Sequence, residues 1–318
     1  MSFLGLAIAL LIFPLFAPTE YAVRIGNIVL IYAMLTLGLN YTVGWTGQIS
    51  LAQAAFWGIG AYTSAILTAK FPMFDPWVAM LIAAGVAGTL GILLGLPTLK
   101  IKGHYLALAT IGFGEVVQIF FNNSRALTGG ADGISGIPPL SIFGYVLSTE
   151  TRMYYVLLIV VVLLVVICMR IHRSTYGRAF IALRDDELAA EVIGISTTMT
   201  KTLAFAIGAA YAGLAGSFYA HLFLYISPDT FGFEQSLLML SMLVIGGLGS
   251  IAGALVGALI GVALPELLRV FGIYSMSIYT LLVVLVIIFL PDGAAGFARN
   301  DKNRRGGALT RAMSRWRL

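Results

Sequence analysis

A succession of long apolar runs is the feature that most constrains how this chain can fold. Most runs approach the roughly 20 helical residues needed to cross a hydrocarbon core of about 30 Å, and they do not alternate as the strands of a transmembrane β-barrel do. Only 10% of the 318 residues are charged, whereas soluble domains average about 25%. The sequence therefore predicts an all-α integral membrane protein, a polytopic helical bundle of about ten transmembrane spans, some of them short or broken. The expected spans are 1–18, 22–43, 48–69, 76–97, 104–121, 152–169, 202–225, 235–248, 251–270 and 274–290.

A polar segment at 170–201 interrupts these runs, and we call it the polar island. It holds nine of the 33 charged residues in about a tenth of the chain, so it must face water rather than hydrocarbon. Residues 176–192 contain no proline and are rich in Ala and Leu, Ser174 or Thr175 can cap a helix there, and Gly194 follows where a helix would end. The island is thus expected to carry a short surface helix.

Placing the polar island in the cytoplasm assigns every other loop by alternation. Fourteen of the 19 Lys and Arg residues then lie on the cytoplasmic side, as the positive-inside rule requires, with both termini there too. The net charge of +5 is then explained by anionic headgroups of the lipid bilayer, with no need for nucleic acid. We expect a transmembrane domain over 1–298, with cytoplasmic loop 170–201 and external loop 122–151, followed by a basic cytoplasmic tail at 299–318. The external loop is rich in Gly and Pro over 127–139 and is expected to form successive turns.

Two of the expected spans are irregular. The run 235–248 is short for a crossing helix, and only Gly249 and Ser250 separate it from 251–270. This break is either a tight cytoplasmic turn or part of a discontinuous helix beside a pathway. The run 48–69 opens with several polar side chains, and its start, Gly-Gln-Ile, faintly resembles the Gly-Ser-Ile at 249–251.

Polar side chains within the apolar runs are candidates for the wall of a translocation pathway, because each is costly to bury in a membrane. Glu115, near the middle of its run, is the most costly of them. Hydrogen bonding between helices is the alternative role, and the sequence leaves both open. At the end of another run, Glu266 and Arg269 are spaced for a local ion pair. The pathway candidates are Gln48, Ser50, Gln53, Tyr62, Thr110 and Glu115.

The chain shows no arrangement of residues for catalysis. No GxxxxGK[ST] motif is present for binding nucleotide phosphates, and no Ser, His and Asp set shares a predicted face. The three histidines are scattered, which predicts no metal site and no cofactor. No enzymatic activity is therefore expected, and if energy from ATP is used, another subunit must supply it.

Six stretches, spread over most of the length, are distinctive in sequence. They are LGLNYTVGWTGQISLAQAAFWGIGAY (37–62), HYLALATIGFGEVVQIFFNN (104–123), LTGGADGISGIP (127–138), YGRAFIALRDDELAAEVIGI (176–195), AHLFLYISPDTFGF (220–233) and VIGGLGSIAGALVG (244–257). Through these stretches the chain resembles the permease subunits of branched-chain amino acid ABC importers, of the LivM type. The resemblance implies a bacterial inner-membrane subunit that pairs with a second homologous permease, two cytoplasmic ATPases and a periplasmic substrate-binding protein.

The same resemblance identifies the polar island as the helix that couples the permease to its ATPase. Ala189, Ala190 and Gly194 match the family's EAA-type motif, but Leu188 stands at the Glu position and Glu187 lies one residue earlier. The expected coupling residues are Arg178, Arg184, Asp185, Asp186, Glu187, Ala189, Ala190 and Gly194.

Two other functions remain open at this point. Members of the same family that import urea or short amides share these motifs, because the separate binding protein sets much of the specificity. A secondary amino acid carrier driven by protons or sodium would instead use Glu115 and Glu266 as coupling residues, but it would not need a charged surface helix.

Overall fold

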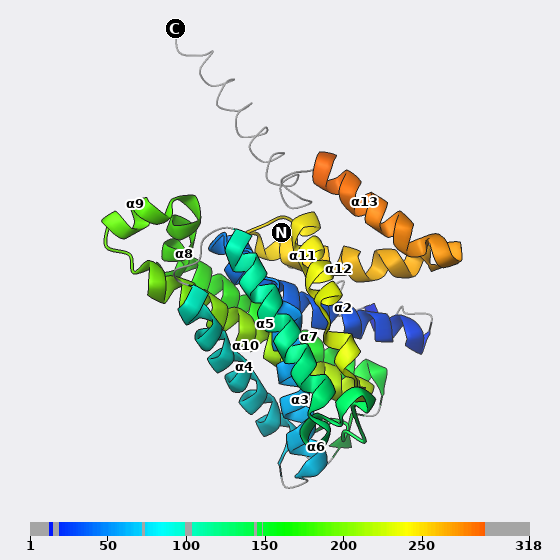
Figure 1. Cartoon of the computed structure of the whole chain (residues 1–318). Coiled ribbons are helices and arrows are strands. Elements are labelled where there is room, and N and C mark those ends of the chain that lie inside the picture. Colours follow the sequence, from blue (N-terminus) through cyan, green and yellow to red (C-terminus); the bar gives the residue numbers. More distant parts are fainter. Residues whose placement is uncertain are drawn as a thin grey trace.

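The structure is a computed structural model that describes residues 13–14, 19–71, 74–98, 104–142, 145–147 and 149–289. The predicted first span, Lys100, Lys102 and the basic tail lie wholly or mostly outside the described residues. Helices pack side by side through the described part of the chain, with α8 and α9 projecting at one end of the bundle (Figure 1). The longer elements are α2 (Glu20–Leu39), which continues as a π-helical turn (Asn40–Trp45), α3 (Gln53–Lys70), α4 (Pro76–Thr98), α5 (His104–Asn123), α7 (Glu150–Arg173), α8 (Thr175–Asp185), α9 (Glu187–Val192), α10 (Thr197–Phe223), α11 (Phe233–Gly246), α12 (Ile251–Leu268) and α13 (Ser275–Phe289).

Six helices in the described part of the chain are long and apolar enough to cross a membrane. They are Glu20–Trp45, Pro76–Leu96, Tyr105–Asn123, Glu150–Arg173, Thr197–Phe223 and Ile251–Gly272. The prediction of an all-α, polytopic membrane protein is therefore confirmed, while the count of ten spans is not. One reason is that α3 (Gln53–Lys70), which covers most of the run 48–69, has 18 residues but is not apolar enough to count among them. Another is that α11 has only 14 residues, which at 1.5 Å per residue reach about 21 Å.

Helix α10 forms the centre of the bundle and packs along α2, α3 and α4. Small residues allow this close packing, as is common between membrane helices. A Cβ on Gly213 of α10 would lie 2.6 Å from the Cβ of Ala87 of α4, and a Cβ on Gly216 would collide with the carbonyl oxygen of Trp57 in α3. The large buried side chains, including Trp45, Trp57 and Phe218, fill the remaining space.

The segment after α5 consists mainly of turns, as its glycines predict. It contains a short helix α6 (Arg125–Thr128), a 3₁₀ turn (Gly130–Asp132) and strands β1 (Ile134–Ser135), β2 (Ser141–Ile142) and β3 (Tyr145–Val146). Gly129, Gly130, Gly133 and Gly136 all have positive φ, which favours glycine. Strand β1 pairs antiparallel with β4 (Tyr225–Ile226), with Ile134 opposite Ile226. This pairing ties the loop to the chain after α10.

Candidate functional site: two helix breaks and the polar island

Two helix breaks interrupt the apolar helices near the polar island. The first runs from the π-helical turn through residues 46–52 to the start of α3, and the second is the Gly247–Ser250 turn between α11 and α12. Gly47 and Gly249 adopt φ of +68° and +78°, a left-handed conformation that side chains disfavour. The Gly-Gln-Ile and Gly-Ser-Ile segments, similar in sequence, thus each begin at a glycine with positive φ.

Several predicted pathway residues hold the first break together. Thr110 Oγ1 of α5 accepts a hydrogen bond from the backbone N–H of Leu51 at 3.0 Å, and Ser50 Oγ lies 3.5 Å from the N–H of Ala52. The Gln53 side chain donates to the carbonyl oxygen of Leu35 at 3.0 Å. Non-helical backbone within a membrane needs such partners. These three side chains are therefore committed to internal hydrogen bonds.

Gln48 and Tyr62 differ from this group. Both are buried, yet Gln48 Oε1 and the Tyr62 hydroxyl have no hydrogen-bond partner among the described residues. The Tyr62 ring packs against Phe121 and Phe231, with ring centroids 4.3 and 5.9 Å away. A buried polar atom without a partner costs about 1–3 kcal/mol. Gln48 and Tyr62 are thus the two predicted pathway residues that have a buried polar atom with no hydrogen-bond partner among the described residues.

Glu115 lies apart from the other pathway candidates. Its side chain is exposed on α5, and it forms no ion pair with any residue in the described part of the chain. Thr110, five residues earlier, is fully buried against the first break. The structure therefore does not bring Glu115 together with Gln48 or Gln53.

The polar island folds as two helices rather than the single helix expected over 176–192. Ser174 caps α8, as predicted, through a bond from the N–H of Gly177. The helix stops at Asp186, which has extended backbone angles and whose carboxylate accepts from the N–H groups of Leu188 and Ala189 at 2.9 and 3.1 Å. Asp186 thus ends one helix because it caps the next. The chain then turns at Gly194, with φ of +86°.

Arg184 connects the polar island to both helix breaks. Its guanidinium donates a 2.8 Å hydrogen bond to the carbonyl oxygen of Gly44 in the π-helical turn. Gly249 lies on the other side, where its N–H donates to Asn40 Oδ1 and its carbonyl accepts from Trp45 Nε1, both at 2.9 Å. We call Asn40, Gly44, Trp45, Arg184 and Gly249 the Arg184 junction. The sequence pointed to Arg184 as a coupling residue, to Gly249 as a helix break and to Asn40 as a polar residue within an apolar run, but it gave no role to Gly44 or Trp45.

An ion pair joins α9 to the start of α10. Lys201 Nζ lies 2.7 Å from Glu187 Oε1, and the side chains are 4% and 28% exposed. A cavity of about 270 Å³ lies between this pair and the first break, and its lining also includes Thr46, Gly47 and Gln48. Predicted coupling residues therefore surround a small polar cavity, with Arg184, Asp185 and Asp186 in its wall.

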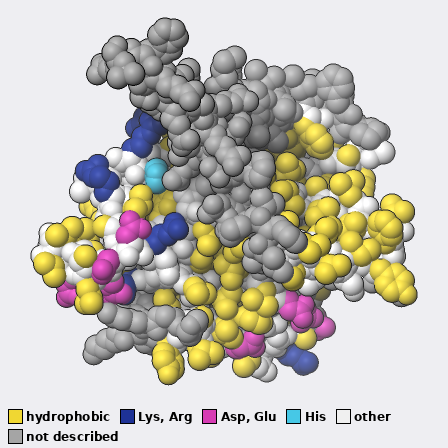
Figure 2. Space-filling view, turned by 90° about the horizontal axis from the view of Figure 1, so that it is seen from above, with side chains coloured by type: hydrophobic (Ala, Val, Ile, Leu, Met, Phe, Trp, Pro, Cys, Tyr) yellow, Lys and Arg dark blue, Asp and Glu magenta, His cyan; other side chains and the backbone are white. Residues whose placement is uncertain are grey.

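The outer surface of the polar island combines charge with exposed apolar side chains. Leu188, Val192 and Ile193 are 66, 86 and 73% exposed, and Asp185 is exposed close to them in the chain. Figure 2, seen from above, shows acidic and basic side chains beside hydrophobic ones at the left edge of the molecule. A water-facing surface with this mixture is typical of a protein interface. Ala190 is buried underneath, whereas Ala189 and Arg178 are exposed.

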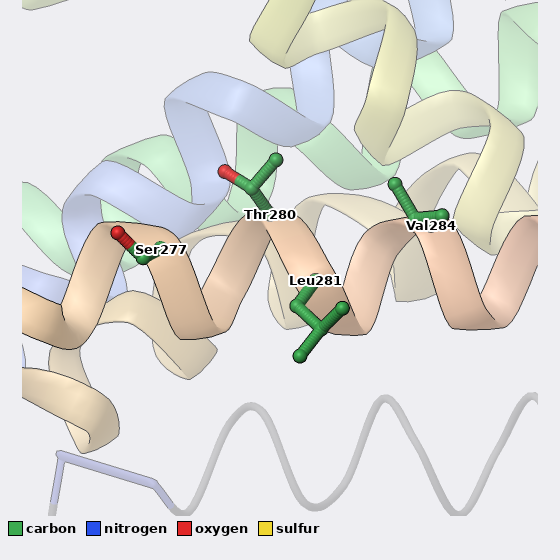
Figure 3. A pocket seen from close by; sticks show the side chains of 4 residues that line it. All are labelled: Ser277, Thr280, Leu281 and Val284. Carbon is green, nitrogen blue, oxygen red and sulfur yellow. The ribbon is translucent and has the colours of Figure 1, made fainter.

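A second hollow of about 470 Å³ lies along α13, where Ser277, Thr280, Leu281 and Val284 line it. These four residues follow one another on a single helix (Figure 3), and none carries a charge. The Glu266–Arg269 pair is present at 3.3 Å, as its spacing predicts, and Tyr21 bonds to both side chains.

The fold defines the class: a polytopic α-helical membrane protein. The chain belongs to the family of branched-chain amino acid transport system permease components, whose profile matches residues 21–291. It is 36% identical to the LivM permease proteins of the high-affinity branched-chain amino acid transport systems of Salmonella typhimurium and Escherichia coli K12, over 92% of this chain and 74% of theirs. It is 29% identical to the LivH permease protein of Salmonella typhimurium, over 85% of this chain and 93% of that protein. No solved structure matches the chain.

Proposed function

We propose that this chain is one transmembrane subunit of an ABC importer for branched-chain amino acids. It pairs with a second, homologous permease in a bacterial inner membrane, receives substrate from a periplasmic binding protein, and is driven by two separate ATPase subunits. Similarity to both LivM and LivH proteins supports the pairing of two permeases. With the polar island in the cytoplasm, both termini lie there too, and the shorter helices α3, α11 and α13 complete about ten spans together with the N-terminal run.

The observation that carries the proposal is the Arg184 junction. Arg184 belongs to the water-facing polar island, yet its guanidinium holds the π-helical turn at Gly44 beside Gly249. A movement imposed on α8 and α9 by an ATPase therefore reaches both helix breaks through one side chain. Discontinuous helices are where alternating-access transporters bind substrate and open or close.

Within this function, the pathway lies beside the first break. Gln48 has a free polar atom at the break and Tyr62 has one further along α3, while Ser50, Gln53 and Thr110 hold the backbone that shapes the break. The Tyr62 ring packs against the uncharged rings of Phe121 and Phe231, and such surroundings suit an amino acid with an apolar side chain. Glu115 does not line this pathway within the chain, because its side chain faces outward on α5.

Uptake by proteoliposomes tests the proposal. The complete complex should import labelled leucine only with ATP inside, should be insensitive to proton and sodium ionophores, and should not accept urea or acetamide as competitors. Purified alone, this chain should hydrolyse no ATP and move no leucine. Leucine uptake by the lone chain under an ion gradient would establish a secondary carrier instead, and competition by urea or acetamide would move the substrate to the amide class.

A further inference from the structure

The outward face of α5 carries a carboxylate near the middle of the helix, unlike the exposed faces of α4 and α7. Glu115 is exposed near the middle of the helix, in line with exposed Leu108, Gly112 and Ile119. Only 17% of the apolar 18-residue stretch of this helix is buried, the smallest share among the six candidate spans. We call Leu108, Gly112, Glu115, Val116 and Ile119 the α5 face.

Two other helices show what a lipid-facing surface looks like in this protein. On α4 the exposed positions include Leu81, Val86 and Leu93, together with Gly85, and on α7 they include Ile159 and Leu163. None of these exposed positions is charged. The α5 face, with its carboxylate, therefore differs from the uncharged surfaces that α4 and α7 present to lipid.

The cost of a carboxylate decides what can cover the α5 face. An acidic residue at the centre of a membrane helix costs about 2.5–3.5 kcal/mol on insertion scales, unless it finds a polar partner. Glu115 has no ion-pair partner in the described part of this chain. A polar or basic side chain on another subunit would remove this cost by donating hydrogen bonds to the carboxylate.

The glycine one turn away from Glu115 provides room for such a subunit. A Cβ built on Gly112 meets no atom within 4 Å, so the surface is open there to a close approach by another helix. Small residues let membrane helices approach closely, but Gly85 on α4 is equally open, so Glu115 is what distinguishes the α5 face. Gly112 and Glu115 together therefore combine close backbone approach with a hydrogen-bonding anchor.

We infer that the α5 face is the surface on which the second permease subunit docks, with Glu115 accepting hydrogen bonds from polar or basic side chains of that subunit. The inference rests on the proposed function, which supplies a second permease. The buried side of α5 already holds the first break through Thr110. A docked partner would therefore press on the helix that shapes the break, which links assembly of the pair to the geometry of the pathway.

Nitroxide labels at two matched glycines test the docking surface. Cys168 is the only cysteine of the chain and is buried, so Cys168→Ala gives a cysteine-free background. Gly112→Cys on α5 and Gly85→Cys on α4 are then labelled, since a Cβ at either position meets nothing within 4 Å. Spectra are recorded for the lone chain and for the chain co-purified with the LivH-type permease of the same genome.

We expect the partner to immobilise the label at 112 and to leave the label at 85 as mobile as before. In parallel, Gly112→Trp should lower recovery of the pair about tenfold, equivalent to about 1.4 kcal/mol, while Gly85→Trp should not. Both variants should unfold at the wild-type temperature when isolated, because both sites are open. Glu115→Leu should weaken the pair and Glu115→Gln, which can still accept hydrogen bonds, should weaken it less.

Three outcomes separate this inference from the proposed function. If a pair forms and the label at 112 stays mobile in lipid, the inference is wrong and the importer assignment stands. If the label at 112 becomes accessible to a water-soluble relaxing agent in the assembled pair, the α5 face lines a hydrated pathway instead, which also overturns the inference. If no permease pair forms with the unaltered chain, the proposed function itself fails.

Discussion

Replacing Arg184 by alanine should uncouple ATP hydrolysis from transport while leaving the bundle folded. The guanidinium donates one charged hydrogen bond, 2.8 Å long, to the carbonyl oxygen of Gly44. Hydrogen bonds to charged groups contribute about 1.5–3 kcal/mol, and the exposure of Arg184 places this one near the low end. A loss of about 1.5 kcal/mol in the link between α8 and the first break corresponds to roughly a tenfold change in the population of coupled states.

The assay is the ratio of leucine imported to ATP hydrolysed by the reconstituted complex. We expect that ratio to fall about tenfold in Arg184→Ala, with ATPase activity maintained, because the guanidinium lies beside the breaks and not on the outer surface of α9. Arg184→Lys retains a cation and a donor and should recover part of the ratio. Arg173→Ala is the matched control, since Arg173 is exposed at the end of α7.

Protein stability separates uncoupling from unfolding. The melting temperature of the purified Arg184→Ala chain should stay within a few degrees of the wild type, because a change of about 1 kcal/mol moves the midpoint by only about 2–4 °C in a protein of this size or somewhat smaller. An unchanged import-to-hydrolysis ratio in a folded Arg184→Ala complex would refute the reasoning, because the junction would then carry no coupling energy.

Three further predictions follow from single contacts. Glu187→Ala should destabilise the chain by about 3 kcal/mol, because it leaves the almost fully buried ammonium of Lys201 without this partner. Lys201→Met should destabilise it less, because water can reach the carboxylate that remains. Thermal unfolding of both variants and of the double variant measures the difference. Gly249→Ala should lower both stability and the import ratio more than Gly194→Ala does, since both have positive φ but only at 249 would the new Cβ lie 2.8 Å from Arg184 Nη1. Thr110→Val should slow transport and raise hydrogen exchange at the N–H of Leu51, which loses its 3.0 Å acceptor, while Thr110→Ser should behave as wild type.

Hydropathy and charge carried most of the predictable information. The apolar runs predict a polytopic helical protein because transfer into lipid depends on local composition. Likewise, the polar island is recognisable because nine charges in 32 residues cannot enter hydrocarbon. The glycines at 129–136 predict turns for an equally local reason, and all four have positive φ. The family motifs added the class of transporter, which composition alone does not contain.

Roles that depend on distant partners were not predictable from the same patterns. Gln53 and Thr110 are polar residues within apolar runs. In the structure, Gln53 bonds to the backbone of Leu35, and Thr110 bonds to the backbone of Leu51, 59 positions away in the sequence. Similarly, the division of the polar island at Asp186 depends on which N–H groups its carboxylate reaches. The sequence shows that these side chains are polar, but it does not show which donors and acceptors they bond to in the folded chain.

The position of the two helix breaks explains why one arginine can matter to both. An unbroken helix moves as a rod, so a push at its end displaces its whole length equally. At a break, the same push changes the angle between two segments, because the glycines at 47 and 249 provide backbone that already departs from helical geometry. Arg184 contacts Gly44 directly, its nitrogen lies close to Gly249, and Gly249 is bonded in turn to Asn40 and Trp45. In the proposed coupling role, a displacement of α8 would act on α2, α3, α11 and α12 at the breaks where these helices begin or end, and a single junction would suffice to move both breaks together.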